Sequence, residues 1–278
     1  MDLSKVIGLG VAGNFAGHLE QAGEAKDFLN VKVNEAQAPK ALFPFYLPNP
    51  QGDISSSFLK VYPLTDNVLV APCGEGDNLQ VEPEIGVIFD IIYEGERVVN
   101  LIPKFFGAYN DSSIRRAGAK KISEKKNWGE GTKGFAGNLL AIDEFTADSL
   151  ISNYRICCYL KRDNKLIAYG VDSSARDYSY MYEKLIGWMI EKMNNQKDEG
   201  PAENIHDYLL ACNKPEQMLV SIGATRYTEF GQHNYLTKGD ISIVIVYPED
   251  LTVHQIEQMI EKEDWSDTRV SALIQKVV

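Results

Sequence analysis

The chain has 278 residues, of which 44% are hydrophobic and 24% charged, so it is long enough to bury a full core as one large domain or two small ones. The net charge of −11 argues against binding to a nucleic-acid backbone, because that binding needs clustered Lys and Arg. The longest apolar run, "ISIVIVY" at 241–247, is too short to span a bilayer and no signal-peptide stretch is recognised, so we expect a cytoplasmic protein.

Three glycines near the start are spaced as G-x-G-x-x-G: Gly8, Gly10 and Gly13. This pattern can bind a dinucleotide when it lies between a strand and a helix, and a helix is predicted over 15–29, with Glu35 at a tolerable distance to hold a ribose. The strand before Gly8 is short, however, and a proline-rich segment replaces the next strand and helix. A Rossmann-type dinucleotide-binding protein is therefore the least favoured alternative.

The next elements predict a β-rich domain. Residues 38–52 contain four prolines, too many for a helix or a central strand, so an extended connection is expected. Short strand-like runs separated by turn residues follow: "FLKVYPL", "NVLVAP", "EIGVIFDIIYEG" and "RVVNLIP". Two further strands, "YRICCYLK" and "KLIAYGV", are joined by Arg162, Asp163 and Asn164, which suit a hairpin turn.

The last third of the chain predicts helices. Apolar residues at intervals of four predict an amphipathic helix over 178–196, followed by a solvated loop over 195–204. Thr252 and Gln255 form a capping-box pattern, and Ser266 is expected to cap a last short helix. The four cysteines form no C-x-x-C pair, so reduced core thiols are favoured over a disulfide or zinc site.

The most informative stretch for chemistry is "QVEPEIGVIFDI", where Glu82 and Glu84 stand two residues apart before an apolar strand. In an extended segment both side chains point to the same face, and the repulsion between them is relieved by a divalent cation with oxygen ligands. The alternative is a solvated strand end. Asp111 supplies a third carboxylate, and a glycine-rich loop around Lys133 adds a positive charge, which together favour a metal and anion pocket.

In their order along the chain, these motifs resemble the fumarylacetoacetate hydrolase family. The corresponding stretches are "GNFAGH", "APKALFPFYLP", "EPE", "NDSSIR", "TKGFAG" and "GATRYTEFGQHNYLTKGD". The match covers about residues 5–247, which leaves a divergent helical extension at 248–278 on a single domain over 1–278.

The resemblance implies an α+β fold, a β-rich mixed roll or sandwich with flanking helices, and a homodimer. It also implies a Mg²⁺ or Mn²⁺ site, or a Ca²⁺ site, at Glu82, Glu84 and Asp111. Enzymes of the family break carbon–carbon bonds in small 2-oxo or diketo acids by hydrolysis or decarboxylation, or isomerise related acids, through an enolate. The implied substrate contacts are Arg115 and Thr225, and for Arg115 a surface ion pair is an equal alternative.

The catalytic candidates are His18, Glu20 and Lys133, and the first two depart from the family pattern. Hydrolytic members carry Glu three residues after the histidine, where this chain has Gln21, which cannot accept a proton. Glu20 stands at i+2, a position that does not face His18 on a regular helix, whereas Glu24 is another acid that can supply a base. A family member that has lost catalysis and binds or senses a small molecule is therefore the main alternative to an enzyme.

Overall fold

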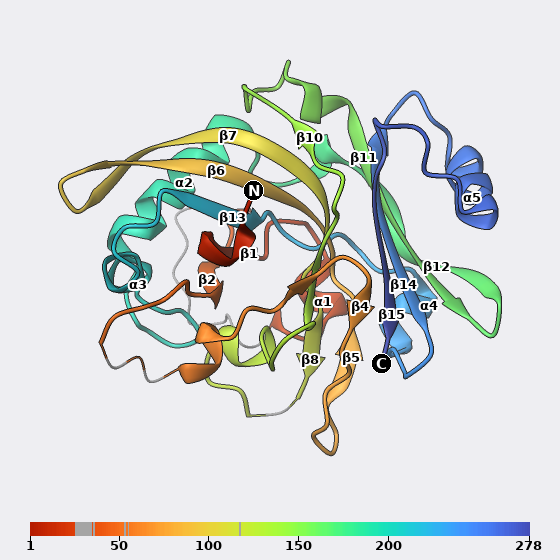
Figure 1. Cartoon of the computed structure of the whole chain (residues 1–278), viewed down its shortest axis with the longest axis horizontal. Coiled ribbons are helices and arrows are strands. Elements are labelled where there is room, and N and C mark those ends of the chain that lie inside the picture. Colours follow the sequence, from red (N-terminus) through yellow and green to blue (C-terminus); the bar gives the residue numbers. More distant parts are fainter. Residues whose placement is uncertain (26–34, 36, 53, 55, 117) are drawn as a thin grey trace.

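The computed structural model describes residues 1–25, 35, 37–52, 54, 56–116 and 118–278, and Figure 1 shows two large sheets packed against each other. The larger sheet has eight strands in the order β2-β1-β13-β6-β7-β9-β3, with β10 paired to β7. Its strands are β1 (Ile7–Ala12), β2 (Ala41–Tyr46), β3 (Leu64–Thr65), β6 (Pro83–Glu94), β7 (Arg97–Asn110), β9 (Lys133–Phe135), β10 (Leu140–Ala141) and β13 (Gln217–Ser221). The pairs β1–β13 and β3–β9 are parallel and the other pairs are antiparallel.

The second sheet has five strands in the order β12-β11-β14-β15-β4, and β5 and β8 form a separate two-stranded ribbon. These strands are β4 (Val68–Leu69), β5 (Asn78–Gln80), β8 (Ser113–Arg115), β11 (Tyr154–Arg162), β12 (Lys165–Ser174), β14 (Ile241–Pro248) and β15 (Ser271–Val277). Asp163 and Asn164 connect β11 to β12 with φ of 50° and 60°, the left-handed conformation of a tight hairpin turn. The predicted hairpin is confirmed.

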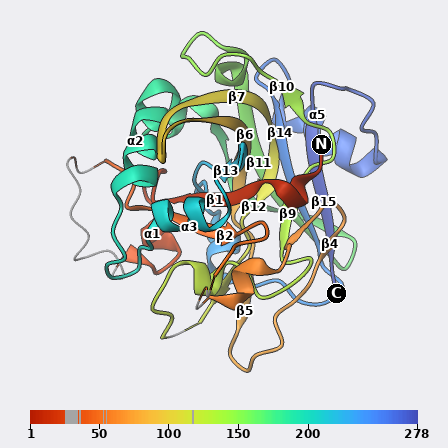
Figure 2. The same ribbon diagram turned by 60° about the vertical axis from the view of Figure 1, so that its left-hand side comes forward.

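Helices cover both sheets. The α-helices are α1 (His18–Gln21), α2 (Tyr182–Asn195), α3 (Ile205–Ala211), α4 (Glu229–His233) and α5 (Val253–Lys262). The larger sheet curls around α2, whose buried Leu185, Met189 and Met193 join the main core (Figure 2). None of the described helices is long and apolar enough to cross a membrane.

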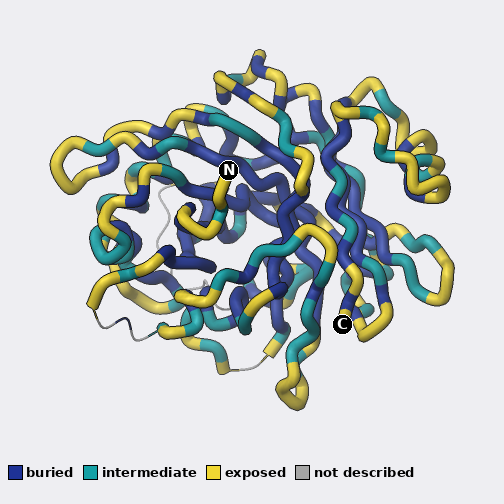
Figure 3. The backbone as a smooth tube through the Cα atoms, in the orientation of Figure 1, coloured by how far each residue is buried: buried dark blue, intermediate teal, exposed yellow. Residues whose placement is uncertain are grey.

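The main core lies between the sheets, and a second apolar cluster lies beneath α5 on the outer face of the five-stranded sheet. The two adjacent cysteines of β11 contribute to different clusters, since Cys158 belongs to the main core and Cys157 to the cluster under α5. Both thiols are buried and unpaired, whereas Cys73 is exposed and Cys212 is partly buried. Figure 3 shows that the inner strands of both sheets are buried and the hairpin ends are exposed. The chain thus has the β-rich α+β fold that the sequence predicted.

The glycine motif serves strand packing. Gly8 and Gly10 lie inside β1, and a Cβ atom added at either would stand 2.3 Å or 2.2 Å from the ring of Phe45 or Phe43 on β2. Gly13, with φ of 73°, turns the chain at the end of β1. These glycines therefore let an aromatic edge strand lie flat on β1.

Two predicted helices are wrong within the described residues. The helix over 15–29 is reduced to α1, because Gly17 (φ 85°) and Gly23 (φ 71°) adopt conformations that break a helix; residues 26–29 lie outside the described part. Ser266 caps no helix, and β15 follows it with a two-residue burial period. The segment 248–278 therefore contains one helix, α5, and one strand of the five-stranded sheet.

Three other predictions need a smaller correction. Part of the proline-rich segment forms β2, which tolerates Pro44 because it is an edge strand. The predicted 178–196 helix begins later, at Tyr182. The 195–204 loop, which leads into α3, was predicted to be solvated, but Gln196 and Glu203 in it are buried.

The predicted capping box is confirmed, since Thr252 and Gln255 form it at the start of α5.

Candidate functional site

The long β6–β7 hairpin brings the three predicted carboxylates together. Glu82 immediately precedes β6, Glu84 is its second residue, and Asp111 follows β7. Because Pro83 pairs with Asn110, the two strand ends place Asp111 beside Glu82, and the Asp111 N–H donates to the Glu82 carbonyl at 2.9 Å. The three side chains are buried, and each offers a carboxylate oxygen within 4.8 Å of the others.

Two buried lysines contact this acidic cluster. The Nζ atom of Lys126 lies 2.6 Å from Oε2 of Glu82 and 2.6 Å from Oδ2 of Asp111. Lys133, the first residue of β9, places its Nζ 2.9 Å from Oδ1 of Asp111 and donates to the Ser112 carbonyl at 2.6 Å. Each lysine thus meets a different oxygen of Asp111.

The two lysines differ in electrostatic environment. Burial alone would lower both pKa values, but the carboxylates of Asp111 and Glu82 raise the pKa of Lys126. Lys133 has one carboxylate partner and is repelled by Lys126, so burial prevails and lowers its pKa to about 8. Lys126 is therefore the firmly charged member of the pair.

The two glutamates also differ. Burial would raise the pKa of both, but Lys126 and Arg115 hold the pKa of Glu82 well below its usual range. Glu84 accepts a hydrogen bond from the Gly223 N–H at 2.7 Å, and burial together with repulsion from Asp111 and Glu82 raises its pKa well above the usual range. Of the two glutamates, Glu84 is therefore the one that needs a further positive charge in order to ionise.

Arg115, at the end of β8, is engaged by the protein itself. Four side chains accept from its guanidinium: Gln80 at 2.7 Å, Glu24 at 2.7 Å, Glu82 at 2.6 Å and Tyr227 at 3.1 Å. Glu24 also accepts from Lys125 at 2.6 Å. The structure therefore shows a buried ion-pair network at Arg115, in place of the surface pair considered above.

His18 lies beside the cluster at the start of α1. Its Nδ1 is 2.8 Å from the Thr225 carbonyl oxygen, and its Nε2 is 3.9 Å from Oε1 of Glu82. Burial lowers the pKa of His18, which favours the neutral ring. Thr225 thus meets His18 through its backbone, and its own N–H donates to the Pro83 carbonyl at 3.1 Å.

Gln21 and Glu20 are the two residues expected to decide whether His18 can act as a base, and the structure gives both of them other surroundings. Gln21 exchanges two hydrogen bonds with the backbone of Tyr227, at 2.8 and 3.1 Å, which is a structural role. Glu20 is exposed on α1, so the structure does not bring it to the acidic cluster. Glu24, a buried acid, lies closer to the site through its ion pair with Arg115.

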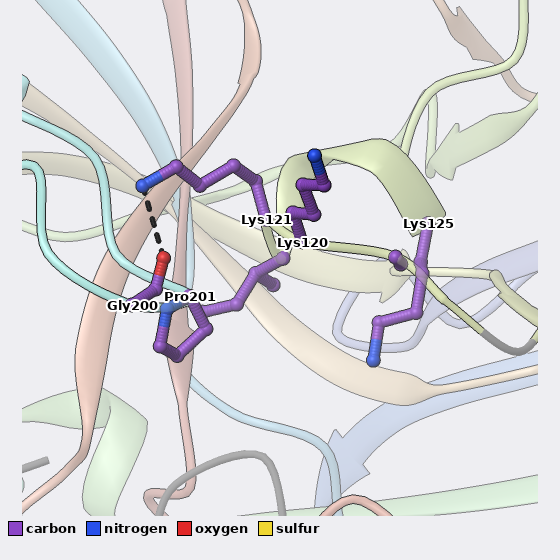
Figure 4. A pocket seen from close by; sticks show the side chains of 7 residues that line it. Lys120, Lys121, Lys125, Gly200 and Pro201 are labelled. Carbon is purple, nitrogen blue, oxygen red and sulfur yellow. Dashed lines mark hydrogen bonds between the residues drawn. The ribbon is translucent and has the colours of Figure 1, made fainter. Parts of the chain in front are cut away.

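A basic pocket adjoins this network. It has a volume of about 230 Å³, and its lining includes Lys120, Lys121 and Lys125 (Figure 4). Lys121 donates to the Gly200 carbonyl at 2.9 Å and pairs with Asp198 at 2.6 Å. Because Lys125 also binds Glu24, the pocket wall is connected directly to the buried charges.

The chemistry of the acidic cluster suits a divalent cation. All the donors are carboxylate oxygens, which hard ions such as Mg²⁺ prefer. The two oxygens of Asp111 form ion pairs with the Lys126 and Lys133 ammonium groups but have no partner with hydrogen-bond geometry among the described residues, so a cation is what these oxygens bind. The donor set therefore fits, with Lys126 as a competing cation.

Sequence reasoning missed Lys126. It stands 44 residues from Glu82 in "SEKKNWGE", just after the 3₁₀-helix η4 (Ser123–Lys125), and a run of charged residues there is typical of an exposed surface. No spacing rule links residue 126 to the E-x-E pair, because the fold alone brings them together.

Comparisons with known proteins agree with this architecture. Two solved structures resemble the whole chain: a 2-keto-3-deoxy-D-arabinonate dehydratase in complex with magnesium and 2,5-dioxopentanoate, and a protein from Oleispira antarctica named as a candidate fumarylacetoacetate isomerase/hydrolase. The first has a TM-score of 0.52 at 14% identity, with 98% of this chain and 72% of that chain covered. The second has a TM-score of 0.50 at 11% identity, with 98% and 93% covered.

The predicted resemblance is confirmed at the level of the fold. No curated protein matches the sequence. A family model described as "Family of unknown function (DUF5718)" matches residues 24–277. The chain therefore belongs to this family, as a divergent protein with the fumarylacetoacetate hydrolase fold.

Proposed function

We propose that the protein is a divalent-cation-dependent enzyme acting on a small 2-oxo or diketo acid. The observation that carries this proposal is the buried cluster of Glu82, Glu84 and Asp111, whose oxygens lie within 4.8 Å of one another. The order of the family motifs supports the proposal. So does the structural neighbour that holds magnesium together with 2,5-dioxopentanoate, a dioxo acid.

A Mg²⁺ or Mn²⁺ ion held by these three carboxylates would polarise the substrate carbonyl and stabilise the charge of an enolate. Lys133 supplies a second positive charge from the other side of Asp111. Because Lys133 is fully buried, its charge acts on a developing oxyanion with little screening by water. These residues support the breaking or rearrangement of a bond next to a carbonyl: carbon–carbon hydrolysis, decarboxylation or isomerisation.

His18 can hold or accept a proton at Nε2. Its other ring nitrogen is directed at a carbonyl oxygen, which accepts only, so the hydrogen of the neutral ring lies on Nδ1 and the lone pair on Nε2.

The family pattern also leads us to propose that the protein is a homodimer in the cytoplasm.

A substrate screen tests the proposal. The purified protein would be incubated with acylpyruvates, oxaloacetate and hydroxylated 2-oxo acids, with Mg²⁺ or Mn²⁺ or with EDTA, and products followed by NMR. We expect the protein to turn over at least one oxo acid. EDTA should abolish this turnover, and added Mn²⁺ should restore it. Turnover unaffected by EDTA would contradict the metal-dependent mechanism.

A second candidate is a small-molecule binding or regulatory protein, favoured because Nδ1 of His18 meets the Thr225 carbonyl oxygen and not a carboxylate. Gln21 is fixed to the Tyr227 backbone and Glu20 is exposed. Thermal stabilisation by an oxo acid without any turnover would support this candidate, whereas metal-dependent turnover would reject it.

A further inference from the structure

The Lys126 ammonium lies between two of the three carboxylates proposed to hold a metal. Its Nζ is 2.6 Å from both Glu82 and Asp111, and the lysine side chain is only 4% exposed. A divalent cation bound by the same oxygens would approach them to about 2.0–2.6 Å, so it and the ammonium cannot occupy this space together.

The remaining contacts of Lys126 are weak compared with those of the other buried cations. In the described part of the chain, its Nζ has two further neighbours, the Asp111 carbonyl at 3.5 Å and the ring of Phe43 at 5.3 Å. Lys133 is additionally anchored to the Ser112 carbonyl, and Arg115 to Gln80 and Tyr227. Lys126 is thus the cation whose position depends most on the acidic cluster itself.

A cavity adjoins the segment that carries Lys126. This lysine follows the short helix η4, outside the large sheets, on a long and flexible stem. A cavity of about 490 Å³ is lined by residues on either side of it, Glu124, Asn127 and Trp128. Lys126 itself does not line this cavity, so a displaced ammonium would reach it through a shift of the 124–128 segment, which belongs to neither large sheet.

We infer that Lys126 is a displaceable internal cation, which holds the acidic cluster together until a divalent ion displaces the ammonium group. This inference rests on the proposed metal site and adds a regulatory step to it. The lysine neutralises Glu82 and Asp111 and so prevents their repulsion, but each metal-binding event must first move it away.

This mechanism predicts that the lysine weakens metal binding. An ion that binds only the open form has its affinity reduced by the fraction of molecules that are open. If the open form makes up about 0.1–10% of the population, removal of the ammonium strengthens binding about 10-fold to 1000-fold.

The test is a direct titration of Mn²⁺ into the wild type, Lys126→Met and Lys121→Met, by calorimetry and by electron paramagnetic resonance of the free ion. Lys121 is the matched control, because it is in the same segment but pairs with Asp198 and two backbone carbonyls. We expect Lys126→Met to bind at least about 10-fold tighter than the wild type and Lys121→Met to bind like it. If Lys126→Met binds Mn²⁺ and the wild type does not, that result would also support displacement of the lysine by the ion.

Equal or weaker Mn²⁺ binding by Lys126→Met overturns the displacement mechanism and leaves the metal site intact. Absence of binding in both proteins overturns the metal site as well, so the two failures are distinguishable. Thermal unfolding provides a second readout: Lys126→Met should melt lower than the wild type without metal and gain more from Mn²⁺. Lys126→Gln should repeat both results if the methionine variant folds poorly, and a gain no larger than that of the wild type contradicts the inference.

Discussion

The Nδ1 atom of His18 lies 2.8 Å from the backbone carbonyl oxygen of Thr225. Since a carbonyl oxygen only accepts, this contact fixes the hydrogen on Nδ1 and leaves the Nε2 lone pair on the side of Glu82. A carboxylate at this position would stabilise a protonated ring, whereas a neutral carbonyl does so weakly. His18 is therefore well oriented but poorly supported as a general base.

Lys133→Met should depress turnover more than His18→Asn. In the proposed mechanism Lys133 brings a buried positive charge to the oxyanion, and loss of one such stabilising group typically costs about 100-fold to 1000-fold in kcat. General-base assistance is worth about as much where it operates, but His18 lacks the carboxylate that supports it in a hydrolase. Both kcat values would be measured on one oxo-acid substrate with saturating Mn²⁺. Efficient acylpyruvate hydrolysis that His18→Asn abolishes would show instead that His18 acts as the base.

The double substitution Glu82→Ala with Glu84→Ala should abolish Mn²⁺ binding in a calorimetric titration, because it leaves one of the three carboxylates proposed to hold the ion. Unchanged Mn²⁺ affinity would show that the ion, if bound, lies elsewhere. Because Glu82 also pairs with Lys126 and Arg115, the folded fraction must be checked by circular dichroism.

Glu84→Gln is a milder test of the same site. The amide oxygen can still accept from the Gly223 N–H, and the high pKa of Glu84 means that little charge is removed from the metal-free protein. We expect Mn²⁺ affinity to fall at least about 10-fold, as ligand-shell changes commonly do, with a melting temperature close to that of the wild type. A large loss of stability with unchanged Mn²⁺ affinity would assign Glu84 a purely structural role.

Arg115→Met should destabilise the fold by about 3–5 kcal/mol, the usual cost of removing one partner from a buried ion pair. The variant leaves Glu24 without its arginine and Glu82 with Lys126 as its remaining close cation. Urea unfolding would measure the loss. A variant of normal stability with a raised KM would instead favour the substrate-carboxylate role expected from the sequence.

Gly10→Ala tests the packing role of the glycine motif. The new Cβ would stand 2.2 Å from the Phe43 ring, and such overpacking typically costs about 1–3 kcal/mol. Gly187→Ala in α2 is the matched control, since its added Cβ meets nothing within 4 Å beyond its chain neighbours and the helix's own backbone, and alanine there should stabilise the helix by about 0.5–1 kcal/mol. Equal effects of the two substitutions on the urea midpoint would contradict this interpretation.

Local patterns predicted the elements that depend on neighbouring residues. The Asp163–Asn164 turn and the Thr252–Gln255 capping box each involve residues at most three positions apart, where backbone preference decides the conformation. Glu82 and Glu84 lie on one face for the same reason. The prediction of a helix over 15–29 is wrong, because it relied on the apolar spacing and did not take account of Gly17 and Gly23, which break the helix.

Contacts between distant segments set the remaining parts of the site. Lys126 reaches Glu82, Glu24 reaches Arg115, and Gly223 reaches Glu84, across 44, 91 and 139 residues. Periodicity does not encode such contacts, since they follow from the sheet order and from the packing of loops against it. The acids could be identified from the sequence because they lie in motifs whose order along the chain matches the family pattern. Lys126 belongs to none of these motifs.

Glu203 should make the stability of the fold depend on pH. It is buried, accepts from the Ser123 hydroxyl at 2.8 Å, and burial raises its pKa to about 7 from an ordinary value of 4.5. Between these two values the folded state holds a proton that the unfolded state releases, so the free energy of unfolding falls as pH rises from about 4.5 to 7.

Glu203→Gln cannot ionise, yet its amide oxygen can still accept from Ser123. Its stability relative to the wild type should therefore rise across the same pH window and reach a gain of up to about 3 kcal/mol above pH 7, at about 1.36 kcal/mol for each pKa unit. Urea unfolding at pH 5 and pH 8 measures the change, with Glu261→Gln, an exposed residue of α5, as the control. The wild type and Glu203→Gln would differ by the same amount at both pH values if Glu203 kept an ordinary pKa. A gain that is much larger at pH 8 than at pH 5, and absent from Glu261→Gln, identifies Glu203 as the titrating group. This buried carboxyl holds η4, and with it the segment bearing Lys126, against the loop before α3.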